Sequence, residues 1–135
     1  MKQSTSRFLD CLRFENLRYY TIEEGREGLP DVVKVAYFAR GIYDISILFL
    51  FNIGYIEVKI LGVENTPLYK KEALVEGVNE LYIEYKWLEF TIERDSISAK
   101  IDTTFGIDGA IDICYGIIDK ISCIMGSNKG SCHLW

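Results

Sequence analysis

The sequence contains one histidine, His133, and no pair of cysteines in C-x-x-C spacing. Histidine-activated nucleophiles need an ordered base beside the reactive group, and structural zinc sites bring their ligands together in such short pairs. Here the histidine adjoins Cys132 in residues 127–135, a mostly small and polar segment that is typical of a mobile tail. We therefore expect neither Cys–His catalysis nor a zinc site, and we predict no cofactor.

The sequence also has no apolar run long enough to span a membrane and no excess of positive charge. Its most apolar window, residues 45–53, is much shorter than the roughly 20 residues that a membrane-spanning helix requires. The first residues lack the apolar core of a signal peptide. Twenty acidic against fifteen basic residues disfavour binding to nucleic acid and to anionic membranes. We therefore expect a cytoplasmic protein that binds neither of these partners.

The four cysteines are expected to be reduced thiols, because disulfides are rare in the cytoplasm. Cys114 and Cys123 are separated by about two and a half turns of a predicted helix, so their side chains face opposite directions. Cys114 falls within an apolar stripe of that helix, which predicts a place in the core.

What the sequence has in quantity is apolar residues, which make up 49% of its 135 residues. That fraction excludes a mainly disordered chain, and the length suffices for one domain with its own core. We assign residues 1–126 to a single domain and leave residues 127–135 outside it.

Residues 66–104 contain a predicted helix followed directly by a predicted hairpin. Thr66 can cap the helix, and Pro67 suits its first turn because the missing N–H would be unpaired there. Apolar residues then recur at the spacing of one buried helical face. They are Leu74, Val75, Val78, Leu81, Tyr82 and Tyr85.

After this helix, apolar residues alternate with polar ones, as in a strand with one buried face. Phe90 and Ile92 point the same way in the first strand of the hairpin. A two-residue turn at 95–96 would pair Ile92 with Ala99 and Phe90 with Ile101, which keeps the buried faces of the two strands together.

The same rules predict the remaining elements of the chain. Helices are expected at residues 6–17 and 107–125, and strands at 32–39, 43–51 and 55–61, with a further strand beginning near residues 19–22. The resulting order, α-β-β-β-α-β-β-α, predicts an α+β domain whose antiparallel sheet carries helices mainly on one face.

The strand at 43–51 is apolar on both of its faces. Leu48 and Leu50 lie opposite four large apolar side chains, so each face needs cover. Helices can cover one face, whereas a loop or a second subunit must cover the other. The loop at 23–31 offers only Leu29 and Pro30 as apolar cover, so we expect a homodimer that buries Leu48 and Leu50.

Six aromatic residues cluster in the predicted strands between residues 37 and 55. Most of them are expected in the core, and the competing interpretation is an exposed sheet face that binds a partner or a second copy. The six are Tyr37, Phe38, Tyr43, Phe49, Phe51 and Tyr55.

Glu72, Glu76, Glu80 and Glu84 recur every four residues and form an acidic ridge along the predicted middle helix. A solvated helix face is the plain interpretation of this ridge. A docking strip for a basic partner is the alternative. A divalent-metal site is a third, although a solvent-facing ridge lacks converging ligands.

Three stretches of sequence add to this order of elements: residues 78–81 (VNEL), residues 85–90 (YKWLEF) and the hairpin at 91–101 with its acidic turn residue Asp95. Together with the order of elements, they resemble the YbjN family. Members of that family adopt a type III secretion chaperone-like fold and are described as sensory transduction regulators. The resemblance covers residues 8–125 and implies this fold, a bacterial cytosolic setting and dimerisation. It carries over no catalytic residue.

We therefore predict a non-enzymatic protein-interaction module, an adaptor or chaperone-like regulator that binds another protein through the acidic ridge or through Leu48 and Leu50. The alternative is a small-ligand sensor with a pocket between helices and sheet. An enzyme comes third, and an immunity protein against a toxin is a variant of the first prediction. An interaction module should show a continuous apolar or acidic patch, whereas a sensor should show a pocket with converging polar groups. An enzyme should contain buried titratable groups whose pKa values are shifted.

Overall fold

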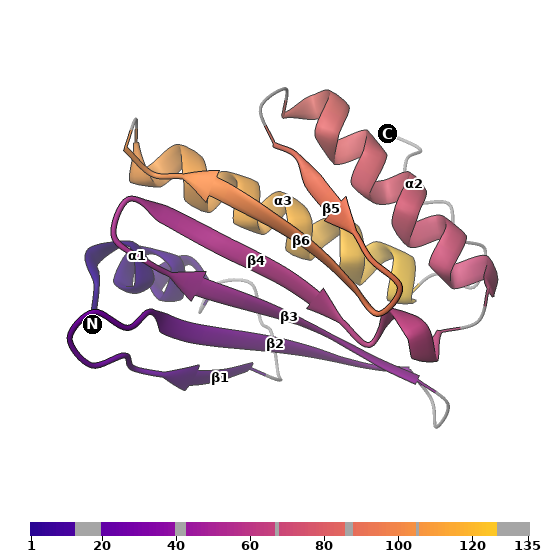
Figure 1. Cartoon of the computed structure of the whole chain (residues 1–135), viewed down its shortest axis with the longest axis horizontal. Helices are drawn as coiled ribbons and strands as arrows, with labels where there is room; N and C mark the ends of the chain where they lie inside the picture. Colours follow the sequence, from indigo (N-terminus) through magenta and orange to yellow (C-terminus); the bar gives the residue numbers. More distant parts are fainter. Residues whose placement is uncertain (13–19, 40–42, 67, 86–87, 105, 127–135) are drawn as a thin grey trace.

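The computed structural model describes residues 1–12, 20–39, 43–66, 68–85, 88–104 and 106–126 (Figure 1). The predicted tail at 127–135, with Cys132 and His133, lies outside these residues. The described elements are, in chain order, α1 (Gln3–Leu12), β1 (Tyr20–Glu23), β2 (Asp31–Ala39), β3 (Tyr43–Phe51), β4 (Tyr55–Leu61), a 3-10 helix (Val63–Asn65), α2 (Leu68–Glu84), β5 (Phe90–Ile92), β6 (Ser96–Asp102) and α3 (Ile107–Gly126).

The strands form one antiparallel sheet with the order β1-β2-β3-β4-β6-β5. The predicted α+β class is therefore confirmed, and so is the order of elements, including the strand predicted to begin near residues 19–22, which is β1 at one edge. β3 and β4 have the predicted bounds because alternating apolar residues mark them and Gly54 permits the turn between them with a φ of 87°. β5, the other edge, is only three residues long.

The hairpin of β5 and β6 has a different register from the predicted one. Its turn lies at residues 94–95, where the Glu93 N–H donates to the Ser96 carbonyl at 2.8 Å. Ile92 therefore pairs with Ile97 and Phe90 with Ala99, two residues away from the prediction. Side chains alternate between the two faces of a strand, so a shift of two residues leaves the same side chains on the buried face. The pattern of buried side chains therefore could not distinguish the two registers.

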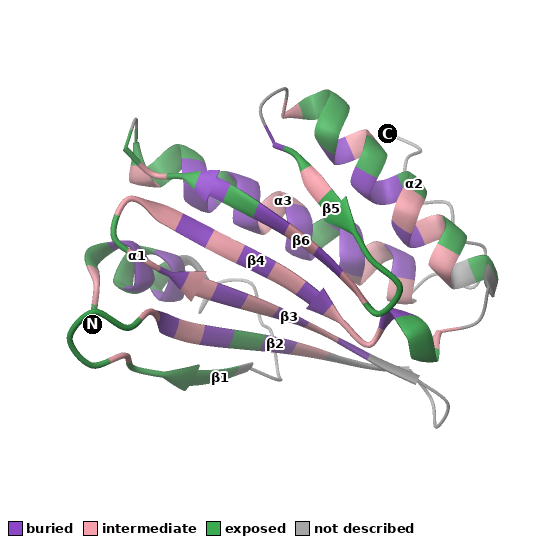
Figure 2. Cartoon of the chain, in the orientation of Figure 1, coloured by how far each residue is buried: buried purple, intermediate pink, exposed green. Residues whose placement is uncertain are grey.

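The helices α1 and α3 lie behind the sheet and cover one of its faces (Figure 1). Along β3 and β4, fully buried residues on this inner face alternate with half-buried residues on the outer face (Figure 2). Phe8 of α1 anchors the inner layer, because its ring centroid lies 5.0 Å from that of Phe49 and 5.2 Å from that of Phe51. These contacts place the core between the sheet and the helix layer and confirm the inner place predicted for Phe49 and Phe51, two of the three aromatic residues of β3. The side chains of Tyr37, Phe38 and Tyr43 lie outside the described part of the structure.

The remaining helix, α2, packs against α3 and lies beside the β5 edge of the sheet (Figure 1). Two glycines allow this close packing. A Cβ on Gly77 would lie 2.8 Å from Cδ1 of Ile124, and a Cβ on Gly116 would lie 2.7 Å from the hydroxyl oxygen of Tyr85. Because α2 is at the edge, its inner stripe is narrower than predicted: Leu74, Val78 and Leu81 are buried, but Tyr82 is 49% exposed.

A buried carboxylate joins α1 to the start of β2. Asp31 accepts hydrogen bonds from the Lys2 N–H at 2.8 Å, the Thr5 hydroxyl at 2.7 Å and the Gly25 N–H at 2.8 Å. Burial by itself would raise the pKa of Asp31, but the three hydrogen bonds outweigh it and hold that pKa below its usual value. We call Asp31 and its three hydrogen bonds the Asp31 clasp. It holds Lys2 and Thr5 against the start of β2 and so explains why α1 begins earlier than the predicted residue 6.

Thr66, the predicted cap of α2, contacts the turn that precedes that helix. The Thr66 hydroxyl donates to the Val63 carbonyl at 2.7 Å and so closes the 3-10 helix that precedes α2. Pro67 lies outside the described residues.

Candidate interaction surfaces

The outer face of the sheet has two long rows of cross-strand neighbours. One row runs from Val32 through Leu50 and Glu57 to Lys100, and the next runs from Lys34 through Leu48, Lys59 and Ser98 to Thr91. Because directly paired residues lie on the same face of a sheet, these side chains form one continuous surface. Figure 2 shows this face turned towards the reader, with α1 and α3 behind it.

The part of this face over β2, β3 and β4 is apolar. Val32, Leu48, Leu50 and Leu61 are all half-buried. α1 and α3 lie on the other side of the sheet and α2 lies beside its β5 edge, so within the described ranges these residues are covered only by their neighbours on the face. The loop that could have covered them instead forms the end of the β1–β2 hairpin, and its Leu29 is 59% exposed. The structure thus places Leu48 and Leu50 on the same face, as predicted, where each is half-buried among the described residues.

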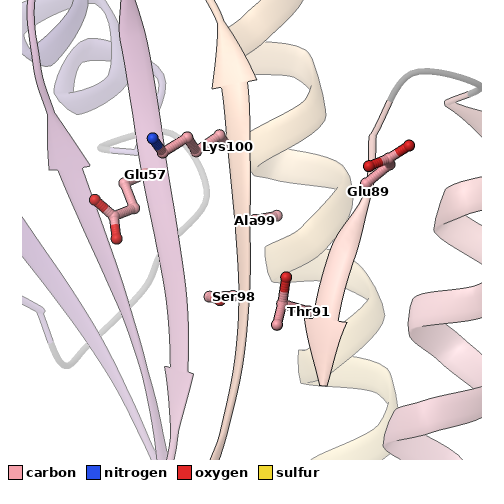
Figure 3. A pocket seen from close by; sticks show the side chains of 6 residues that line it. All are labelled: Glu57, Glu89, Thr91, Ser98, Ala99 and Lys100. Carbon is pink, nitrogen blue, oxygen red and sulfur yellow. The ribbon is translucent and has the colours of Figure 1, made fainter. Parts of the chain in front are cut away.

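The part of the face over β4, β5 and β6 is polar and slightly hollowed (Figure 3). The hollow has a volume of about 370 Å³ and is lined by Glu57, Glu89, Thr91, Ser98, Ala99 and Lys100. Its charged side chains do not converge: Lys100 extends over β4, where its Nζ lies 5.0 Å from the centroid of the Tyr55 ring, and Glu89 points away on the other side. Glu57 lies 3.5 Å from Lys59. This arrangement is a charged surface rather than an enclosed small-molecule site.

A second hollow lies between α2 and the edge strand β5. Its volume is about 340 Å³, and Val78, Asn79 and Tyr82 of α2 line one side of it. Glu89, Phe90 and Ile92 line the other side. The side chain of Ile92 is 46% exposed here, at the rim opposite Tyr82. Two large apolar side chains therefore border an open groove beside a sheet edge.

Within the described residues, the backbone of β5 has no partner on the side of this groove. Glu93 and Ser96 form a hydrogen-bonded pair at the end of the hairpin. Along an antiparallel ladder, every second pair is of this kind, and in the pairs between them the N–H and C=O groups point away from the partner strand. The N–H and C=O groups of Phe90 and Ile92 consequently point away from β6. Among the described residues, neither backbone has a hydrogen-bond partner on another element.

The acidic ridge does not remain on one side of α2. Glu72, Glu76 and Glu84 are exposed, but Glu80 reaches α3, where its Oε2 accepts a hydrogen bond from Lys120 Nζ at 2.7 Å. A four-residue spacing advances about 40° around a helix at each step, so the ridge winds towards the neighbouring helix. No group of three or more potential ligands that could hold a metal ion occurs in the part of the chain that the structure describes.

The cysteines differ from the prediction at one position. Cys114 is buried, as predicted, and burial raises the pKa of its thiol. Cys123 is in a disulfide, whose second cysteine is not among the residues with described side chains. The expectation of four reduced thiols is therefore wrong for Cys123. It followed from an assumed compartment, which residue spacing does not determine.

The other titratable side chains with shifted pKa lie on separate elements. Burial, followed by the carboxylates of Glu84, Asp112 and Asp119, raises the pKa of Tyr85 at the end of α2. Hydrogen bonds from the hydroxyl and N–H of Thr104 hold the pKa of Asp102 at the end of β6 below its usual value. Each shift has a local structural cause, and the two groups do not share a cavity.

The sequence predictions assigned no residues to two features of these surfaces. The first is the buried Lys120, for which the only sequence signal is its isolation: it is the single basic residue of the predicted helix at 107–125. The second is the groove between α2 and β5. It depends on where α2 lies relative to the sheet, and helical periodicity does not determine that position.

The chain matches no protein-family model, no curated protein and no solved structure. None of the helices within the described ranges is long and apolar enough to cross a membrane.

Proposed function

We propose that this chain is a non-enzymatic protein-interaction module, an adaptor or chaperone-like regulator, which forms a homodimer through the outer face of its sheet and binds a further protein. One observation carries the proposal: Val32, Leu48, Leu50 and Leu61 form an apolar surface that the described helices leave open. Apolar surfaces of this kind on monomeric domains mark interaction sites.

A second copy suits this surface in shape and in charge. Two sheets can pack face to face at a separation of about 10 Å, with their side chains interdigitated. Leu48 and Leu50 are already half-buried in the single chain, so a second copy adds the burial of their remaining exposed apolar area, at about 25 cal/mol per Å². The same face carries Glu23, Glu57 and Asp102 as well as Lys34, Lys59 and Lys100, so opposite charges can meet across a two-fold axis.

Replacement of the two leucines tests this proposal. The double variant Leu48→Lys with Leu50→Lys should have the mass of a monomer in size-exclusion chromatography with light scattering. The matched control, Leu29→Lys, also adds a charge at an exposed leucine but lies away from the outer face, and it should remain a dimer. A double variant that stays dimeric, with an unchanged circular dichroism spectrum, would place the interface elsewhere.

The small-ligand sensor is retained as a second candidate because a hollow does lie between a helix and the sheet, at the β5 edge. Its lining combines the apolar side chains of Val78, Phe90 and Ile92 with the polar groups of Asn79, Tyr82 and Glu89, which suits a small compound with both apolar and polar parts. A sensor predicts saturable changes in the NMR signals of these residues when small amphipathic compounds are titrated. The resemblance to the YbjN family remains a prediction that supports the module and the dimer equally.

A further inference from the structure

We infer that the groove between α2 and β5 binds an extended segment of a partner protein, which adds to the sheet as a new strand beside β5. This inference rests on the proposed function as an interaction module and specifies where, and by what chemistry, the further protein binds. It concerns a surface different from the outer face assigned to the dimer.

The first argument comes from the backbone of the edge strand. The N–H and C=O groups of Phe90 and Ile92 point away from β6 and have no partner on another described element. An added strand would pair with these groups in the regular antiparallel or parallel pattern. Main-chain hydrogen bonds of this kind supply affinity in β-augmentation, whereas side-chain pockets supply specificity.

The second argument comes from the side chains below the added strand. Phe90 and Ile92 point to the inner face of the sheet, the face on which Val78 and Tyr82 of α2 line the hollow. Alternate residues of an added strand would point into this hollow of about 340 Å³. The segment should therefore have apolar residues at every second position, and these would bury the exposed parts of Tyr82 and Ile92.

The charges beside β5 favour a different protein over a second copy of this chain as the occupant of the groove. Glu89 and Glu93 flank β5, and both are exposed on the outer face. If two β5 strands paired antiparallel about Thr91, Glu89 of each copy would lie opposite Glu93 of the other. Like charges directly opposite on a sheet face are destabilising. Arg94 and Asp95 of the turn cancel each other's charge, so the strand favours a segment with basic residues at its outward positions.

The experiment uses a defined probe of this chemistry: a short capped peptide of alternating lysine and valine, labelled with fluorescein. Wild-type protein should bind it saturably in fluorescence anisotropy. A control peptide of the same composition, with lysines and valines in separate blocks, should bind at least about tenfold more weakly, because only the alternating peptide can place valines in the groove. A second control, N-methylated at the valines, removes edge hydrogen bonds without changing charge and should weaken binding by a similar factor.

Protein variants then locate the site. Ile92→Pro removes an outward N–H of β5 and should weaken binding about tenfold, because proline at an edge position leaves the β5–β6 ladder intact. Tyr82→Ala should also weaken binding, whereas Tyr69→Ala, at the exposed start of the same helix, should not. The double variant Glu89→Gln with Glu93→Gln should lower affinity by roughly three- to tenfold and reduce its salt dependence. The charge-matched control, Glu72→Gln with Glu76→Gln, should bind like the wild type.

Amide hydrogen exchange gives a readout that does not depend on any variant folding correctly. Peptide binding should protect the amides of Phe90 and Ile92 and leave those of the other edge strand, β1, unchanged. Protection that appears only around Leu48 and Leu50 would overturn the groove but retain the interaction module. Equal binding of the alternating, block and N-methylated peptides would overturn strand addition. Neither result would alter the oligomeric state, which tests the proposed function separately.

Discussion

Lys120 of α3 and Glu80 of α2 form an ion pair at 2.7 Å, although the Lys120 side chain is only 7% exposed. The aliphatic part of the Lys120 side chain packs against α2 at Gly77, where a Cβ would lie 3.1 Å from the Lys120 Cγ. The pair therefore fixes how the edge helix sits on the helix layer, and α2 in turn forms one wall of the groove beside β5.

Removal of the acidic partner should destabilise the fold. Glu80→Ala removes a charged hydrogen bond of the buried Lys120, and we expect a loss of about 1–3 kcal/mol in the free energy of unfolding. Urea denaturation measures this loss. Glu76→Ala, four residues earlier and exposed, is the control and should change stability by less than about 0.5 kcal/mol. Equal effects of both variants would contradict the structural role of the pair.

The close packing of α2 on α3 predicts a specific steric effect. Gly116→Ala places a methyl group 2.7 Å from the Tyr85 hydroxyl oxygen and should cost about 1–3 kcal/mol in thermal or urea unfolding. Gly109→Ala, on the same helix with open space around it, should instead be neutral or stabilise the protein by up to about 1 kcal/mol. Adding Tyr85→Phe to Gly116→Ala should restore part of the loss. No recovery would show that the hydroxyl is not the obstacle.

The clasp at Asp31 predicts a dependence of stability on acid pH. Its pKa is lower in the folded protein than in the unfolded chain, whose value is near the ordinary 3.8. The clasp therefore stabilises the fold fully above that value, and the contribution is lost as pH falls through the lower folded pKa. Asp31→Asn should reduce the urea midpoint at pH 7 and weaken the decline in stability below about pH 4. Asp10→Asn, exposed on α1, should keep the wild-type profile.

The disulfide at Cys123 predicts a simple chemical result. Protein denatured without reductant should contain fewer titratable thiols than its four cysteines, and reduction should release the missing ones. Peptide mapping under non-reducing conditions should find Cys123 cross-linked and Cys114 free. Four titratable thiols without reductant would show that the bond does not form in solution.

Much of the fold could be predicted from the sequence, because period-two and helical patterns mark the inner residues of β3, β4 and α3 directly. The hairpin register could not be predicted from the pattern of buried side chains, since pairing Ile92 with Ile97 or with Ala99 buries the same set. Turn geometry decides between the two registers, and residues 94–96 give weak turn signals.

The candidate surfaces were predicted unequally. Leu48 and Leu50 stood out because a strand that is apolar on both faces is a local sequence feature. The groove depends on the placement of α2 beside β5, and the Glu80–Lys120 pair joins residues 40 positions apart. Such long-range arrangements leave no periodic signal, so the acidic ridge was predicted as a unit although one of its members faces a neighbouring helix.

Sedimentation equilibrium of the wild-type protein over a range of micromolar concentrations tests the central claim most directly. The account predicts a reversible monomer–dimer equilibrium that approaches twice the chain mass of 15.5 kDa at the highest concentrations. A single species of 15.5 kDa that persists at high micromolar concentration would contradict the homodimer and leave the outer face of the sheet without its proposed partner.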